Sequence, residues 1–288
     1  MKKIGLLFML AIGLYSCGSV PITGRQQLNL VSDSEVLALS LQEYDDYIKT
    51  AKKSTDKTAT AMVEKVGRNI ANAVEAYFKA TGSESLISGY QWEFNLIDDP
   101  QVNAFCMPGG KIVVYTGILP YTQNETGLAV VLGHEVGHAI AKHANERMSQ
   151  QMALQYGGAA LGAILGGASA GVQNIGAAVY GLGSQVGVML PFNRKQELEA
   201  DHLGLILMAI AGYDPNQAVP FWERMSQQGG GNLELLSTHP SDNTRISEIK
   251  KEIPEAMEYY NAIYGKSAAP APSATPPKNS NTNSNWHF

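Results

Sequence analysis

The 288-residue sequence is poor in cysteine, in basic residues and in long apolar runs. Two cysteines, Cys17 and Cys106, are too few for a disulfide framework. The 21 basic side chains are outnumbered by 26 acidic ones, and no Lys/Arg cluster is present, which excludes a nucleic-acid-binding surface. What the sequence does contain is 44 % hydrophobic residues, enough in a chain of this length to bury one sizeable core.

The N-terminus has the pattern of a bacterial lipoprotein signal. Two lysines precede the apolar run Ile4–Leu14, which at 11 residues is too short to span a bilayer, and Leu-Tyr-Ser-Cys17 follows. This ending resembles a lipobox, although Tyr15 is bulkier than usual. We predict a signal peptide over residues 1–16, acylation of Cys17 and a linker over 17–32. Cleavage as an ordinary secreted protein and an uncleaved anchor are the alternatives. The lipoprotein reading places the protein in the cell envelope facing the periplasm, at the outer rather than the inner membrane.

The middle of the chain predicts a mainly helical α+β domain over residues 33–264. Apolar residues recur at helical spacing over Lys57–Ala80. Alternating or β-branched residues predict strands at Tyr90–Ile97 and Lys111–Tyr115. A helical pattern then runs from about Asn124 to Met152, so a small sheet is expected beside this helix.

Three later segments complete the expected organisation. Residues 152–193 carry a Gly/Ala-rich stretch free of charge from Met152 to its end, read as an excursion over the cleft, with a transmembrane hairpin as the alternative. Helices are expected over Glu197–Ala211, Pro215–Gln227 and Asp242–Tyr264. The Pro/Ser/Asn-rich residues 265–288 are predicted to be disordered.

The sequence His134-Glu135-Val136-Gly137-His138 is the HExxH pattern. Four residues of helix advance about 400°, so the two imidazoles lie about 40° apart and can reach one cation. Glu135 lies beside that face, where it can hold a water. A catalytic zinc site needs a third protein ligand and an open position. Glu197 and Asp201 share one helix face, so one carboxylate can bind the metal while the other orients a ligand imidazole.

Together these motifs resemble metallopeptidase family forty-eight. The family comprises HtpX-type heat-shock proteases, CAAX prenyl endopeptidases, the mitochondrial Oma-type protease and periplasmic lipoprotein proteases. The segments that carry the resemblance are HExxH, NRKQELEADHLG, AGYDP, the Ser-Thr-His-Pro turn at 237–240 with Arg245, and the upstream NAF, PGG and VPITGR. The resemblance implies a gluzincin fold, the ligands His134, His138 and Glu197, and Asp201 as the residue that orients a ligand. It is strongest to the lipid-tethered periplasmic branch.

The remaining histidines and Cys106 are weighed separately. His239 lies in a turn that could place its imidazole over the metal, either as an oxyanion donor or as a latch that occupies the open position. His143 lies about 180° round the helix from His134, His202 adjoins Asp201, and both are expected to point elsewhere. Cys106 is read as a small buried hydrophobe rather than a ligand.

These observations predict a zinc metalloendopeptidase of the cell envelope with one Zn²⁺ per chain. Glu135 would act as the general base. Unfolded or misassembled polypeptides would lie extended along the edge of the strand formed by Lys111, Ile112, Val113, Val114 and Tyr115. Envelope assembly machinery is a further expected partner. The alternative function is a zinc-stabilised, chaperone-like binding module with little proteolysis.

Overall fold

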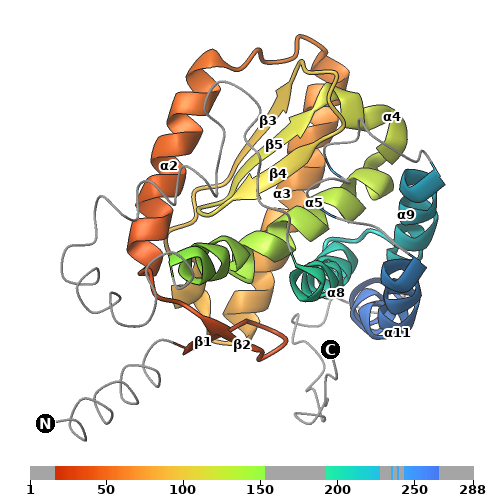
Figure 1. Ribbon diagram of the computed structural model, residues 1–288. Coiled ribbons are helices and arrows are strands. Elements are labelled where there is room, and N and C mark those ends of the chain that lie inside the picture. Colours follow the sequence, from red (N-terminus) through yellow and green to blue (C-terminus); the bar gives the residue numbers. More distant parts are fainter. Residues whose placement is uncertain (1–16, 153–192, 228–234, 236–238, 240–242, 266–288) are drawn as a thin grey trace, which may run out of the picture. The chain divides into compact units, whose positions relative to one another are not determined.

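The computed structural model describes residues 17–152, 193–227, 235, 239 and 243–265. The chain divides into two compact units, Met1–Thr50 with Ile140–Leu190 and Ala51–Ala139 with Pro191–Phe288. The fold class is α+β and mainly helical, as predicted (Figure 1).

The described residues of the first unit form a short hairpin and two helical segments. Strand β1 (Cys17–Ser19) pairs antiparallel with β2 (Gln26–Leu28), and helix α2 (Asp33–Thr50) follows. Residues 143–152 are also helical, and Glu146 from this segment accepts two hydrogen bonds of 2.8 Å from the Arg25 guanidinium. The segment 17–32, predicted to be a lipid-tethered linker, is thus held by backbone pairing and by the contact of Arg25 with Glu146.

The second unit is built around a three-stranded sheet in the order β3-β5-β4. Strand β3 (Glu93–Ile97) runs parallel to β5 (Lys111–Tyr115), and β4 (Ala104–Met107) runs antiparallel to it. The turn between β4 and β5 needs its two glycines, Gly109 and Gly110, whose φ values of 90° and 83° are disfavoured for residues with a Cβ. The bounds of strand β4 were not predicted, because four residues beside a turn show too little alternation of apolar and polar side chains.

The order of the strands corrects one site prediction. The strand of Lys111, Ile112, Val113, Val114 and Tyr115 is central, paired on both sides, and all five residues are buried. It has no free edge to which a substrate could add, so its assignment as the substrate strand is wrong. The edge strands of the described sheet are β3 and β4, and β4 lies on the side of α5 in Figure 1.

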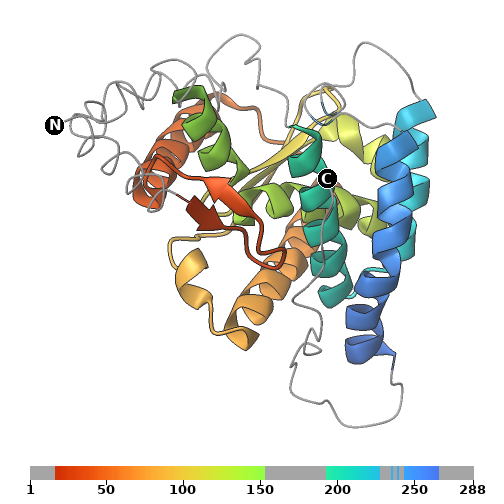
Figure 2. The same cartoon turned by 60° about the horizontal axis from the view of Figure 1, so that its bottom comes forward.

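Five longer helices accompany this sheet in the part of the chain that the structure describes, and Figure 2 shows α11 alongside α8 and α9. Their bounds are α3 (Lys57–Ala80), α5 (Glu125–Ile140), α8 (Arg194–Ile210), α9 (Ala218–Gln227) and α11 (Asn243–Tyr264). The connections contain the short helices η1 (Glu84–Ile87), η2 (Thr116–Ile118), α4 (Leu119–Thr122) and η3 (Pro215–Gln217). Asp56 caps α3, and Asn193 and Gln196 form a capping box on α8.

The helix predicted from Asn124 to Met152 is interrupted. Helix α5 ends at Ile140, and Lys142 adopts a φ of 57° before the helical residues 143–152 begin. A residue in the left-handed region cannot continue a right-handed helix, so the helix ends before this residue. The predictions for residues 1–16, for most of the 152–193 excursion and for the 266–288 tail lie outside the described residues. Within the described part, no helix is both long and apolar enough to cross a membrane.

Candidate metal centre

Helix α5 carries the HExxH pattern near its C-terminal end. The helix starts after Asn124, whose side-chain oxygen accepts a 3.0 Å hydrogen bond from the Gly127 N–H. From Leu128 onward it is buried all round, which explains why its sequence shows little amphipathic alternation. His134, Glu135 and His138 are all buried.

Helix α8 crosses α5 at unusually close range because both helices have small residues there. A Cβ on Gly137 would lie 2.7 Å from the Ala200 carbonyl oxygen, and one on Gly133 would lie 2.8 Å from that of Gly204. Glycines at the contact therefore allow the two backbones to touch. This approach sets Glu197, one turn before Ala200, against the two histidines of α5.

Four side chains converge where the helices cross: His134, His138, Glu197 and His239. Their candidate ligand atoms all lie within 4.8 Å of one another. The His134 Nε2 atom is 3.1 Å from both His138 Nε2 and His239 Nδ1. The carboxylate oxygens of Glu197 lie 3.1 Å from His239, 3.4 Å from His138 and 3.5 Å from His134.

Asp201 orients one of these imidazoles. Its Oδ1 lies 2.8 Å from His134 Nδ1, one turn along α8 from Glu197. A carboxylate only accepts hydrogen bonds, so His134 Nδ1–H donates, and Nε2 is left as the nitrogen that would bind a metal in the cluster. The geometry matches the two roles left open between Glu197 and Asp201, with Glu197 inside the cluster and Asp201 behind it.

Arg245 holds both carboxylates and was given no role from the sequence. From α11 it contacts Asp201 at 2.6 and 2.8 Å and Glu197 at 3.1 Å, while its guanidinium lies 3.7 Å from the centre of the Trp222 ring. It also donates to the His239 carbonyl at 3.3 Å. The sequence signal was an arginine six residues after His239, which does not reveal that this arginine is buried.

His239 lies inside the cluster rather than above it. Its Nε2 is 3.6 Å from a Glu135 oxygen, and its Nδ1 faces His134 and Glu197. Its N–H donates to the Leu235 carbonyl at 2.8 Å, and the Leu235 N–H donates to the Val102 carbonyl at 3.1 Å. His239 is therefore linked through Leu235 to the chain just before β4.

The charges of the site favour a divalent cation. Glu135, Glu197 and Asp201 bring three carboxylates, and Arg245 is the one buried cation among the described side chains that pairs with them, so the ionised set carries a charge of −2 with neutral imidazoles. Burial and Arg245 lower the pKa of His134, but Asp201 and Glu197 outweigh them and raise it to about 9. The site thus stabilises positive charge at its centre.

Glu135 gives a second indication that the cluster fits a metal ion. Its Oε1 is buried and accepts no hydrogen bond from the described residues. Burial raises the pKa of Glu135 above its ordinary value, against the lowering effect of His239 and His134. A buried carboxylate oxygen beside three imidazoles and a glutamate suits a polar ligand such as water on a metal. The nitrogen and oxygen donors are those zinc takes in proteins.

The other candidate residues lie outside the cluster. Cys106 on β4 is half-buried; burial, and also the nearby charge of Glu135, raise the pKa of its thiol. His202 points away from the site and lies 2.6 Å from Glu252 of α11, and His143 is buried in the first unit. Cys17 heads β1, and its side chain lies outside the description.

Comparison with known proteins places this site in a family. The model of peptidase family M48 matches residues 64–253, which contain the whole cluster. The chain belongs to peptidase family M48. It is 42 % identical over 174 residues to the mitochondrial metalloendopeptidase OMA1 of Schizosaccharomyces pombe, covering 59 % of this chain and 49 % of that protein. The match to OMA1 of Saccharomyces cerevisiae is 31 % over 250 residues, covering 83 % and 70 %.

A bacterial relative is also similar. The β-barrel assembly-enhancing protease of Yersinia pestis is 31 % identical over 168 residues, covering 55 % of this chain and 34 % of that protein. The chain spans about half the length of the first of these relatives, and less of the bacterial one. Zinc, the metal of M48 peptidases, fits the donor set of His134, His138, Glu197 and His239.

Proposed function

We propose that this protein is a zinc-dependent metalloendopeptidase of the bacterial cell envelope that hydrolyses unfolded or misassembled proteins. The observation that carries this proposal is the buried oxygen of Glu135 beside the cluster of His134, His138 and Glu197. A purely structural metal site would not need this carboxylate. The printed names of the M48 relatives, which are metalloendopeptidases and a protease, support the same activity.

The chain's own residues supply the proton transfers. When bound, zinc lowers the pKa of a bound water to about 7 and polarises the scissile carbonyl. Glu135 accepts the proton of the attacking water and delivers it to the leaving amine, a role that its raised pKa favours. Asp201 keeps His134 in the tautomer that binds metal through Nε2, and Arg245 holds Asp201 and Glu197 in place.

His239 acts as a latch in this proposal. Four protein donors leave no open position, whereas hydrolysis needs one for water. His239 lies among the donors, which favours the latch over the oxyanion donor. It has to leave the cluster before the substrate reacts, and because its backbone is linked through Leu235 to Val102, a substrate that reaches the N-terminal end of β4 would disturb this link.

The substrate would pair with β4 instead of β5. Asn103 and Tyr115 are linked by a backbone hydrogen bond, so the backbone groups of Phe105 also point toward β5. Those of Ala104 and Cys106 consequently face the outer edge. Main-chain pairing there binds an extended polypeptide without reading its sequence, and the Cys106 side of β4 lies near Glu135.

The cellular setting rests on the N-terminus. The lipobox-like sequence supports a lipid anchor on Cys17 that holds the catalytic unit on the periplasmic face of the outer membrane. The name of the Yersinia relative, a β-barrel assembly-enhancing protease, supports the envelope assembly machinery as a partner.

The test measures bound zinc and cleavage of fluorescent casein by the full chain in detergent. We expect Glu135→Gln to keep one zinc per chain and lose about 10²- to 10⁴-fold in cleavage rate, because the ligands remain and the proton acceptor is removed. Glu197→Gln should weaken both metal binding and cleavage. Glu75→Gln, an exposed change on α3, serves as the matched control. Casein binding without cleavage by zinc-loaded wild type would favour the chaperone-like alternative.

A further inference from the structure

The outer edge of β3, on the opposite side of the sheet from β4, is only partly paired. Gln91 and Glu93 donate backbone hydrogen bonds to Gly109 and Gly110, so odd-numbered residues of this segment face β5. The backbone groups of Phe94 and of Trp92 must then face outward. Phe94 is half-buried, and in the described part of the chain no backbone partner lies against its outer side.

A segment of the chain itself, residues 52–54, already pairs with one end of this edge through backbone hydrogen bonds. The Ser54 N–H donates 2.8 Å to the Leu96 carbonyl, the Asp98 N–H donates 2.7 Å to the Lys52 carbonyl, and Lys53 forms an antiparallel bridge with Ile97. These contacts are the beginning of a fourth strand on the β3 side of the sheet. The chain leaves the edge after Ser54 because Asp56 caps α3. Two residues further along β3, the next outward pair of backbone groups, on Phe94, is open.

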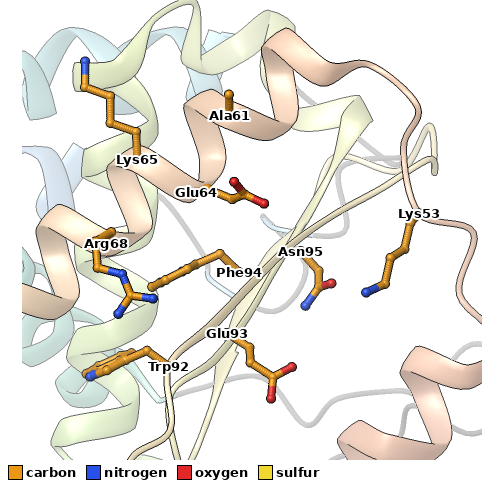
Figure 3. A pocket seen from close by; sticks show the side chains of 9 residues that line it. All are labelled: Lys53, Ala61, Glu64, Lys65, Arg68, Trp92, Glu93, Phe94 and Asn95. Atoms are coloured by element: carbon orange, nitrogen blue, oxygen red, sulfur yellow. The ribbon is translucent and has the colours of Figure 1, made fainter.

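A groove of about 640 Å³ lies along this open part of the edge (Figure 3). One wall is α3 and the other is the segment from Trp92 to Asn95. The floor is apolar where the Phe94 ring packs on Gly67, since a Cβ there would lie 2.3 Å from the ring. The lining residues are Lys53, Ala61, Glu64, Lys65, Arg68, Trp92, Glu93, Phe94 and Asn95.

Some of the charged side chains along the groove already form ion pairs with residues outside it. Lys65 is paired with Glu125, and Glu93 with Lys111. Arg68 is exposed, and its guanidinium lies 4.8 Å from the centre of the ring of Phe94, the residue whose backbone groups are open. Lys53 lies at the other end in Figure 3. The groove therefore offers a cation at each end, with the exposed carboxylate of Glu64 between them, so an acidic side chain is accepted at the ends of the groove rather than at its middle.

We propose that the β3 edge is a second polypeptide-binding site, which takes an extended segment as an antiparallel strand. The segment would exchange backbone hydrogen bonds with Phe94, place an apolar side chain on the Phe94 and Trp92 rings and direct an acidic side chain to Arg68. This inference rests on the proposed function, because it assigns the site to holding a polypeptide substrate away from the cleft. A substrate held at two sites is retained longer than at one.

The experiment is hydrogen exchange of the full chain carrying Glu135→Gln, with reduced, carboxymethylated α-lactalbumin as an unfolded, acidic probe. We expect exchange of residues 92–96 to slow about tenfold at a probe concentration about nine times its Kd. In the same background, Arg68→Glu should weaken probe protection of this segment about five- to tenfold. Lys79→Glu makes the same change of charge on an exposed part of α3 outside the groove and should leave protection unchanged.

The outcomes separate this site from the proposed function. Protection of residues 104–107 without protection of 92–96 would overturn the second site and leave the peptidase proposal standing. Absence of protection at both, together with no casein cleavage by wild type, would overturn both. Slow exchange of residues 92–96 before the probe is added would also overturn the proposal of a second polypeptide-binding site. If that protection depends on protein concentration, the edge is occupied by a second copy of the chain. If it is lost when residues 266–288 are removed, the edge is occupied by the chain's own C-terminal segment. If Arg68→Glu unfolds, Lys53→Glu takes its place.

Discussion

Replacing Gly137 by alanine tests whether the contact between α5 and α8 sets the metal centre. The new Cβ would lie 2.7 Å from the Ala200 carbonyl oxygen, whereas ordinary contact begins at 3.4 Å, so the helices must separate by about 0.7 Å. A metal site tolerates displacements of about 0.2 Å. Glu197, one turn from Ala200 on α8, moves with that helix.

Two effects on stability oppose each other in this variant. Alanine is favoured over glycine within a helix by about 1 kcal/mol. Overpacking a close contact costs about 1–3 kcal/mol, so the net change is a loss of up to about 2 kcal/mol. Zinc affinity should fall more clearly, by about 10- to 100-fold, which corresponds to about 1.4–2.8 kcal/mol.

The assay is zinc competition with a chromophoric chelator, together with urea unfolding of the zinc-free protein. Glu135→Gln is the comparison, since it should lose cleavage while keeping zinc. If Gly137→Ala is more stable than wild type and binds zinc equally tightly, the glycine contact does not position Glu197, and the explanation given for these glycines is refuted.

Three further predictions address other parts of the molecule. His239→Ala should raise basal cleavage of casein and of the protein itself if the latch is correct; a loss of all cleavage would indicate an oxyanion donor, and unchanged rates would show that the turn only packs. Cys17→Ser should abolish lipidation and release the protein from membranes, and mass spectrometry that finds an unmodified Cys17 in wild type would contradict the anchor. For His202, burial lowers the pKa, but the hydrogen bond and charge of Glu252 outweigh it, so the pKa is raised from 6.5. Its ion pair therefore stabilises the fold fully below about pH 6.5 and loses this effect as pH rises through the folded pKa. Urea midpoints of wild type should fall more between pH 6 and 9 than those of His202→Gln, and parallel midpoints would argue against it.

The sequence by itself determined those helices and strands whose pattern of residues lies within a single segment of the chain. The apolar spacing of Lys57–Ala80 predicted helix α3 with its bounds, and the β-branched residues predicted β5. The HExxH spacing places two imidazoles on one face of any helix, so His134 and His138 could be paired before the fold was known. The same holds for Glu197 and Asp201, four residues apart on α8.

Only the tertiary structure decided how these segments combine. Strand β5 reads as a good strand, but whether a strand has a free edge depends on its neighbours, and β3 and β4 take both sides. Arg245 enters the site because α11 packs on α8, which no local pattern reveals. The sequence pointed to His239 as a residue near the metal, but only the structure shows its Nδ1 among the donor atoms. The family resemblance already implied Glu197 as a ligand and Asp201 as the residue that orients one. How close Glu197 comes to the two histidines is set by the glycine contact between two helices distant in sequence, because the distance between backbones is a property of the pair and not of either segment.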